Sequence, residues 1–145
     1  MFHVDKIKTN LVKLSHSILV SGLSYIYINN PTLIIKNLIF FISESYFLCD
    51  TIIIVRSKKI DYPIIYHHIF TILLLGSFYI GYYNDLLIKT YYMGEMSNIS
   101  IYINYHLIKT ESSKEKIVIS SIFQLFWYSY YRIYQMSIVL INNLE

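Results

Sequence analysis

The composition of this 145-residue chain excludes an ordinary soluble domain, because 55% of its residues are hydrophobic, 17% are aromatic, and the apolar residues form long blocks. Its net charge of +3 is small, and the Lys and Arg residues lie scattered at the block boundaries, which excludes the basic patch that a nucleic-acid partner needs. A single cysteine, Cys49, leaves no intramolecular disulfide. The composition therefore predicts one domain that is integral to a membrane.

Five apolar blocks follow a polar, basic segment, residues 1–10, which we expect to lie in the cytosol. They predict an all-α, multi-pass transmembrane helical bundle. The predicted spans are residues 11–28, 37–55, 63–80, 86–108 and 117–141. Pro31 cannot continue the first helix, and Pro63 suits the first turn of the third, where the N–H that proline lacks would be unpaired.

The Lys and Arg residues in the loops and at the ends of the spans indicate the orientation of the chain. With the N-terminus in the cytosol, three of them, the last being Lys13 just inside the first span, lie at the start of the chain, and the loops after the second and fourth spans carry three each. The outer side holds only Lys36 and Lys89, which lies just inside the fourth span. Because cytoplasmic loops carry the excess of Lys and Arg, the pattern predicts five spans with the C-terminus on the opposite side.

Four ionisable side chains are predicted to share one depth. At about 1.5 Å per helical residue, His16, Asp50, His67 and His68 lie roughly 6 to 9 Å inside the cytosolic edge. Intramembrane ionisable groups are expensive, so such a layer indicates a functional site. Adjacent histidines on a helix point about 100° apart, so one is expected to act while the other orients a neighbour or relays a proton. His67 and His68 are therefore candidate catalytic bases, with Asp50 as the group that orients the imidazole.

A second polar layer is predicted deeper in the membrane. Glu95 and Arg132 both lie about 20 Å from the cytosolic edge by the same count, and opposite charges at one depth are expected to pair. Gln124, Tyr128 and Gln135 share the helical face of Arg132. A lipid-binding polar core is predicted from these layers, and its members are His16, Glu95, Asn98, Arg132 and Gln135. A purely structural pair that fixes helix register is the alternative for Glu95 and Arg132.

The single His–His pair disfavours a membrane di-iron enzyme, which needs several histidine-rich boxes. We therefore expect no metal site and no bound cofactor. Acyl-CoA enters only as a co-substrate, and only if the chain transfers acyl groups. The sequence leaves both homo-oligomers and hetero-oligomers open.

Five segments resemble, in order, the TLC domain, the TRAM, LAG and CLN family of membrane proteins that includes the ceramide synthases. They are residues 13–16, 45–50, 66–71, 94–97 and 126–132. The resemblance implies an all-helical membrane bundle in an endoplasmic-reticulum-type membrane, with membrane lipids as partners. Compared with the full domain, the chain is expected to be shorter by one span before the first and one after the fifth.

The resemblance also separates two branches of the family. In the ceramide synthase branch the paired histidines, here His67 and His68, are implicated in N-acylation of a sphingoid base by acyl-CoA. That branch carries further His and Asp residues on the next span, whereas residues 88–97 here keep only Glu95. The Glu-x-Ser form is similar to non-synthase members linked to membrane lipid composition. The resemblance thus favours a protein that binds, senses or regulates lipids, with a lipid acyltransferase and a structural membrane subunit as alternatives.

Overall fold

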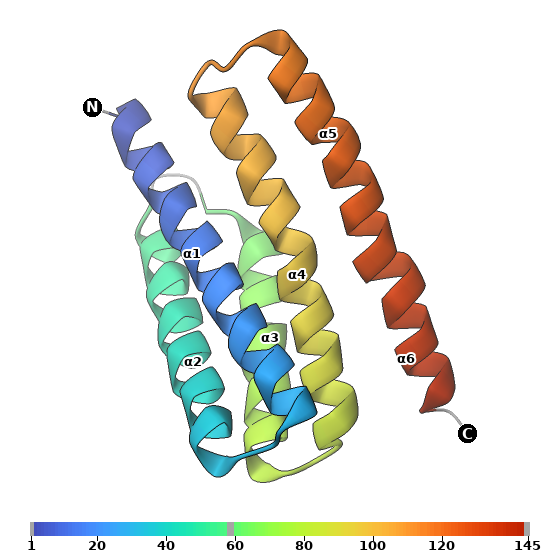
Figure 1. Cartoon of the computed structure of the whole chain (residues 1–145). Coiled ribbons are helices and arrows are strands. Elements are labelled where there is room, and N and C mark those ends of the chain that lie inside the picture. The colour runs from blue at the N-terminus through green and yellow to red at the C-terminus, as the bar shows by residue number, and fades with distance from the viewer. Residues whose placement is uncertain (1, 58–59, 144–145) are drawn as a thin grey trace. The chain divides into compact units, whose positions relative to one another are not determined.

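The computed structural model describes residues 2–57 and 60–143, with the backbone alone for residues 2–6, and the described elements are all helices. They are α1 (Phe2–Asn29), α2 (Leu33–Arg56), α3 (Tyr62–Ile80), α4 (Asn84–Lys109), α5 (Lys114–Ser129), the π-helical segment η1 (Tyr130–Gln135) and α6 (Met136–Asn142) (Figure 1). The last three follow one another without a break.

Local signals in the sequence set the helix ends. Thr32 accepts a hydrogen bond from the Ile35 N–H and so caps α2, which begins four residues before the predicted span. Asp61 caps α3 in the same way through the Ile64 N–H, with Pro63 in the first turn. At the other end of α3, Gly81 adopts a left-handed conformation with φ of 100°, which a glycine tolerates without strain.

In the part of the chain that the structure describes, three helices are long and apolar enough to cross a membrane: Ile7–Asn29 within α1, Leu33–Arg56 and Tyr62–Ile80. The prediction of an all-helical, multi-pass membrane fold is therefore confirmed. Helices α4 and α5 form where the fourth and fifth spans were expected, and their role as spans stays a prediction, as does the orientation of the chain. Helix α1 begins at Phe2, so most of the predicted N-terminal segment is helical and continuous with the first span.

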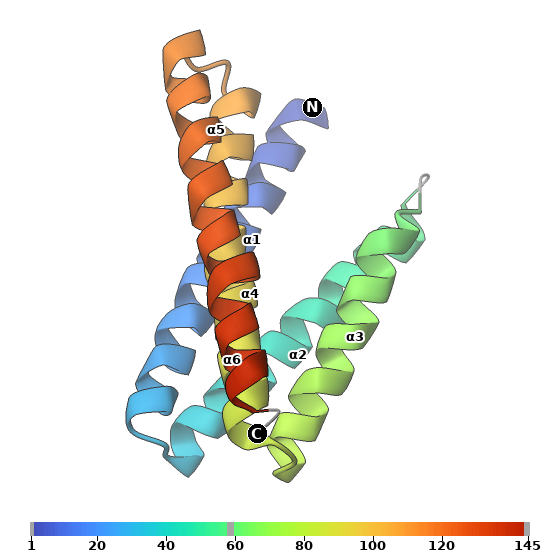
Figure 2. The ribbon, with the colours of Figure 1, turned by 90° about the vertical axis from the view of Figure 1, so that its right-hand side faces the viewer.

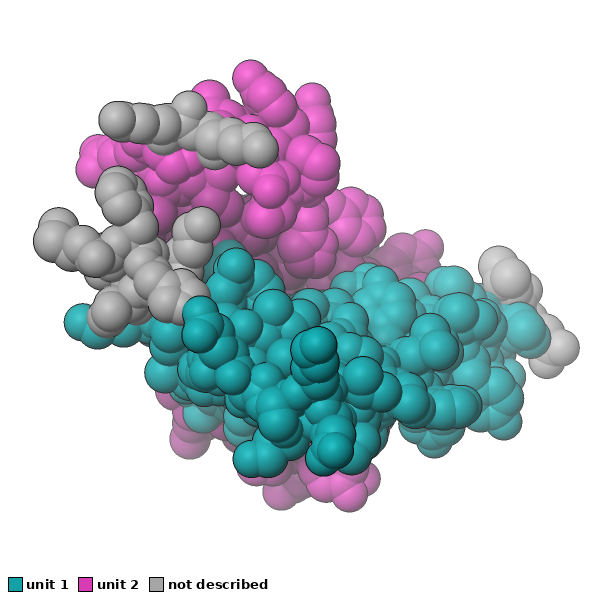
Figure 3. Space-filling view, turned by 90° about the horizontal axis from the view of Figure 1, so that it is seen from above, with its two compact units in different colours: residues 1–22, 92–145 teal, residues 23–91 magenta. Residues whose placement is uncertain are grey.

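The chain divides into two compact units, which Figure 3 shows in different colours. Unit 1 comprises Met1–Gly22 and Tyr92–Glu145, and unit 2 comprises Leu23–Tyr91. In unit 2, α2 and α3 run side by side (Figure 2). In unit 1, α5 lies along the second half of α4, because Asn104 donates to Gln124 at 2.6 Å and Trp127 donates to the Met96 carbonyl at 2.7 Å.

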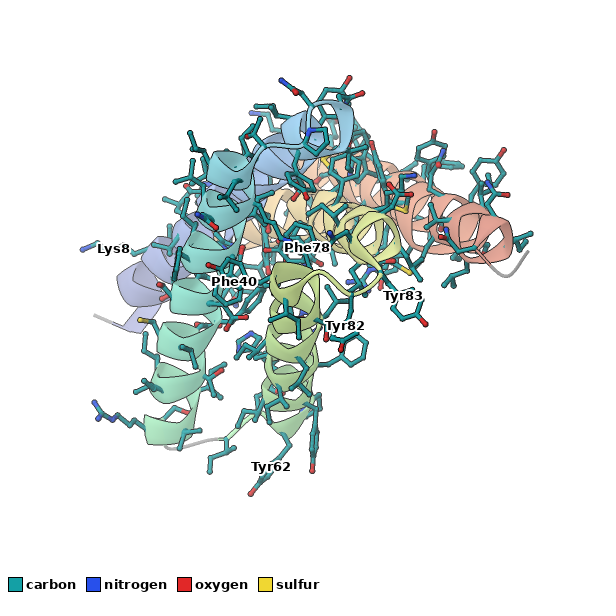
Figure 4. The ribbon with its side chains drawn as sticks, turned by 90° about the horizontal axis from the view of Figure 1, so that it is seen from below. Lys8, Phe40, Tyr62, Phe78, Tyr82 and Tyr83 are labelled. Carbon is teal, nitrogen blue, oxygen red and sulfur yellow. The ribbon has the colours of Figure 1, made fainter. Side chains whose placement is uncertain are left out.

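Aromatic side chains pack against one another in unit 2 near the C-terminal ends of α1 and α3. Phe78 meets Tyr27 edge to face at 5.3 Å, and Phe40 stacks on Tyr79 at 4.1 Å; Phe40 and Phe78 are labelled in Figure 4. Exposed tyrosines mark both ends of α3, Tyr62 at its start and Tyr82 with Tyr83 in the turn that follows it (Figure 4). Tyrosine is enriched at both membrane–water interfaces, so this placement fits a membrane-crossing α3.

The described residues show an inverted distribution of polarity compared with a soluble protein. Their buried set has fourteen polar or charged side chains and only eight apolar or aromatic ones. Large apolar side chains lie outside instead, for example Ile34 at 74% exposed, Phe70 at 66% and Leu73 at 65%. An apolar exterior over a polar interior suits a lipid solvent, in which buried polar groups pair with one another.

Candidate functional site

Two of the three candidate catalytic residues meet in unit 2, where α2 packs against α3. Nε2 of His68 lies 3.6 Å from Oδ2 of Asp50, and both side chains are more than 90% buried. Thr51, beside Asp50 on α2, approaches the other ring nitrogen of His68. We call Asp50, Thr51, His67 and His68 the α2–α3 histidine site.

The hydrogen bonds of Thr51 assign the protonation of the His68 ring. Its hydroxyl donates to the Phe47 carbonyl at 2.7 Å and also lies 2.9 Å from Nδ1 of His68. A hydroxyl has one proton to donate, so we assign Nδ1 of His68 as the donor in the second contact. With Nδ1 directed at Thr51, Nε2 is directed at Asp50, and pairing with that carboxylate requires a proton on Nε2 as well. The His68 imidazole is thus oriented from both of its nitrogens.

His67 has a different environment, although it is the next residue. Its side chain is exposed, whereas the His68 side chain is buried, as expected for neighbours about 100° apart on a helix. Its ring lies 5.9 Å from that of His68 and meets Phe47 edge on at 6.4 Å. The geometry therefore separates the pair into one accessible imidazole and one that is fixed between α2 and α3.

We expect Thr51→Val to lower the free energy of unfolding by about 1–3 kcal/mol, because the valine leaves a buried N–H of His68 without its acceptor. Denaturant unfolding of the detergent-solubilised chain measures the change. Thr51→Ser keeps the hydroxyl and serves as the control. Equal stability of the Val and Ser variants would contradict the assigned hydrogen bond.

Glu95 lies in a separate site in unit 1, between α4 and α1. Its carboxylate is buried and accepts a hydrogen bond from Ser17 at 2.6 Å. Nδ1 of His16 lies 3.9 Å from the same oxygen, and the side chain of Asn98, one turn along α4, also interacts favourably with the carboxylate. We call His16, Ser17, Glu95 and Asn98 the α1–α4 carboxylate site.

This partnership corrects the predicted depth of His16. The sequence placed His16 in the shallow layer and Glu95 in the deep one, yet the two side chains are neighbours. The count assumed a first helix that begins at Leu11, but α1 begins nine residues earlier, at Phe2. His16 therefore lies about 21 Å along its helix, close to the roughly 20 Å estimated for Glu95.

The predicted ion pair between Glu95 and Arg132 is wrong as a direct contact: within the described residues, the two form no ion pair and interact only at longer range. Arg132 instead donates from Nε to the Ser97 hydroxyl at 3.0 Å. Glu95 and Ser97 are two residues apart on α4, so their side chains point about 200° apart. Glu95 contacts α1, and Ser97 is the residue that contacts η1.

Gln135 does not join the polar core with Arg132, because its amide donates to the Tyr130 hydroxyl at 2.6 Å, within η1. The prediction counted three residues along a regular α-helix. A π-helical turn carries an additional residue, so positions three apart no longer share a face.

Two hydroxyl partners of these sites, Ser17 and Thr51, were not predicted from the sequence. Each is the immediate neighbour of a residue that had been singled out, His16 or Asp50. Neighbours in a helix point in different directions, so adjacency was a weak signal. No cluster of three or more metal-ligating side chains is found within residues 2–57 and 60–143.

Comparison with protein families matches the TLC domain to residues 6–143, which includes all five segments on which the resemblance rested. Comparisons with curated proteins and with solved structures gave no significant match. The matched range also includes both polar sites described above.

Proposed function

Because the chain belongs to the TLC-domain family, we propose that this integral membrane protein binds membrane lipids and regulates their composition, with the α2–α3 histidine site as the contact for a polar headgroup. An endoplasmic-reticulum-type membrane is the proposed location. The proposal concerns a lipid that reaches α3 from the bilayer.

The observation that carries the proposal is an exposed imidazole on an apolar surface. His67 lies among exposed neighbours on α3, with Tyr66 at 70%, Phe70 at 66% and Ile69 at 47% exposed. A polar side chain facing hydrocarbon is costly, and a lipid headgroup with hydroxyl, amine or phosphate groups can hydrogen-bond to it. Asp50 and His68 support this position from behind, since they are buried and paired.

A specific feature also favours acyl transfer as a second candidate function. An accessible His67 next to an oriented His68–Asp50 pair has the groups of a general base and its orienter. The imidazole of His67 would take a proton from a lipid amine or hydroxyl while that group attacks the thioester carbonyl of acyl-CoA. The C–S bond would break, and the released thiolate would take the proton back. Acyl-CoA would be a co-substrate in this case.

Lipid analysis of membranes from expressing cells tests both functions. Wild type is compared with the His67→Ala/His68→Ala double variant and with His106→Ala, which removes an imidazole from α4 outside both sites. Lipids that copurify with each chain are identified in parallel, and membrane insertion is checked for each variant.

Each function predicts a different result. Loss of copurifying lipid in the double variant alone, with a changed lipid composition, supports binding and regulation. Appearance of one acylated lipid class with wild type, absent from the double variant, supports acyl transfer. If neither lipid content nor lipid binding changes, and His67→Gln with His68→Asn is also silent, both proposals fail and the pair is structural.

A further inference from the structure

The guanidinium of Arg132 is held in one orientation by contacts within unit 1. Nε donates to the Ser97 hydroxyl at 3.0 Å, and the guanidinium carbon lies over the Tyr128 ring at 5.8 Å. On the side of α4, a Cβ at Gly94 would lie 4.0 Å from Nη2, so this terminal nitrogen lies beside Gly94, which has no side chain. These contacts hold the guanidinium between Ser97, Gly94 and Tyr128 and engage only its Nε in a hydrogen bond.

The terminal nitrogens carry the unused donors of this side chain. Of the five N–H donors of an arginine, only the one on Nε forms a hydrogen bond within the described residues. Within the described residues no carboxylate forms an ion pair with the group, and Glu95, which Ser17 and His16 contact, interacts with it only at longer range. In the predicted fifth span, a fixed cation is unfavourable unless an anion reaches it.

The surroundings of Arg132 point to an amphiphilic anion. The side chain is half-buried, and the continuous helix formed by α5 and η1 exposes Phe126 at 71%, Ile133 at 64% and Tyr134 at 58%. Acyl chains can lie along such apolar residues. In addition, η1 is π-helical, a local widening that frequently occurs at functional sites.

We propose that Arg132 binds the oxyanion of a membrane lipid, a phosphodiester or a carboxylate, through the N–H groups of Nη1 and Nη2. The rigid fork of an arginine matches two oxygens of such a group with two parallel hydrogen bonds, which a lysine cannot reproduce. The inference rests on the proposed function in that the ligand is a membrane lipid. It concerns unit 1, however, and shares no residue with the α2–α3 histidine site.

Lipid binding to the full-length chain, purified in detergent, tests the inference. The probes are phosphatidylcholine for the phosphodiester, oleic acid for the carboxylate, diacylglycerol as a lipid with neither, and inorganic phosphate as the anion without a lipid. Native mass spectrometry gives the dissociation constants. We expect Arg132→Gln to weaken binding of phosphatidylcholine, oleic acid or both at least tenfold and to leave binding of diacylglycerol unchanged. The affinity of Arg132→Lys should lie between those of wild type and Arg132→Gln.

Arg56→Gln is the matched control, because Arg56 is the other arginine of the chain and lies exposed at the end of α2. Gly94→Leu is a second variant that keeps the charge and fills the space beside Nη2, and it should lose the same lipids, whereas Gly94→Ala should keep them. The Gly94 pair decides the question if Arg132→Gln does not fold.

Several outcomes would overturn the inference. These are equal affinities in wild type, Arg132→Gln and Gly94→Leu, equal weakening by Arg56→Gln, or displacement of lipid by inorganic phosphate at equal concentration. The last result would assign the site to free phosphate. Loss of lipid binding in the His67/His68 variant but not in the Arg132 variant would defeat this inference and support the proposed function. Loss of lipid binding in the Arg132 variant but not in the His67/His68 variant would support this inference and defeat the headgroup contact at the α2–α3 histidine site.

Discussion

Replacing Glu95 with alanine is expected to lower the free energy of unfolding by about 1–3 kcal/mol for each buried polar group that it leaves without an acceptor. The carboxylate receives a 2.6 Å hydrogen bond from Ser17 and lies 3.9 Å from Nδ1 of His16. Alanine would remove the favourable interaction with Asn98 and leave these buried groups without their common acceptor. Their burial gives them little access to water as a replacement.

Glu95→Gln is the informative comparison, because glutamine keeps an oxygen acceptor for Ser17 while it removes the charge. We expect it to lose less than half of what the alanine variant loses. Unfolding of the purified chain in increasing SDS, followed by far-UV circular dichroism, measures both. An alanine variant as stable as wild type would show that the α1–α4 carboxylate site does not hold unit 1 together.

The positions of the helices could be predicted from the sequence because their signals are local. The third span was predicted at residues 63–80, and α3 runs from Tyr62 to Ile80 between the Asp61 cap and Gly81. The early start of α1 could not be predicted in this way, because charged residues such as Lys6 and Lys8 delimit the apolar block without interrupting the helix. A span predicted from hydropathy is therefore shorter than the helix that contains it.

The candidate site was predicted less well, because its contacts depend on which face each helix turns to its neighbour. Asp50 and His68 were placed at one depth from the sequence and do meet. The depth estimate failed for His16, and it gave no information on direction for Glu95, which faces α1 instead of Arg132. The π-helical segment η1 has no simple sequence signature, and it moved Gln135 off the face of Arg132.

The two adjacent histidines are expected to respond differently to the same substitution. His68→Ala removes the partner of buried Asp50 and of Thr51, and should lower the free energy of unfolding by about 3 kcal/mol or more. His67→Ala removes an exposed side chain, and should change stability by no more than about 0.5 kcal/mol. Under the proposed function, it should nevertheless reduce copurifying lipid by most of its wild-type amount.

SDS unfolding and lipid extraction on the same preparations separate the two effects. His68→Asn with an intact His67 keeps a polar side chain at the buried position and should recover part of the stability. If His67→Ala destabilised the chain as much as His68→Ala, the exposed imidazole would be a packing group, and the headgroup contact assigned to it would be wrong. If His67→Ala were stable and lost lipid, the result would support one histidine that contacts the ligand and one that supports it. This division is what the opposite burial of the two residues on α3 predicts.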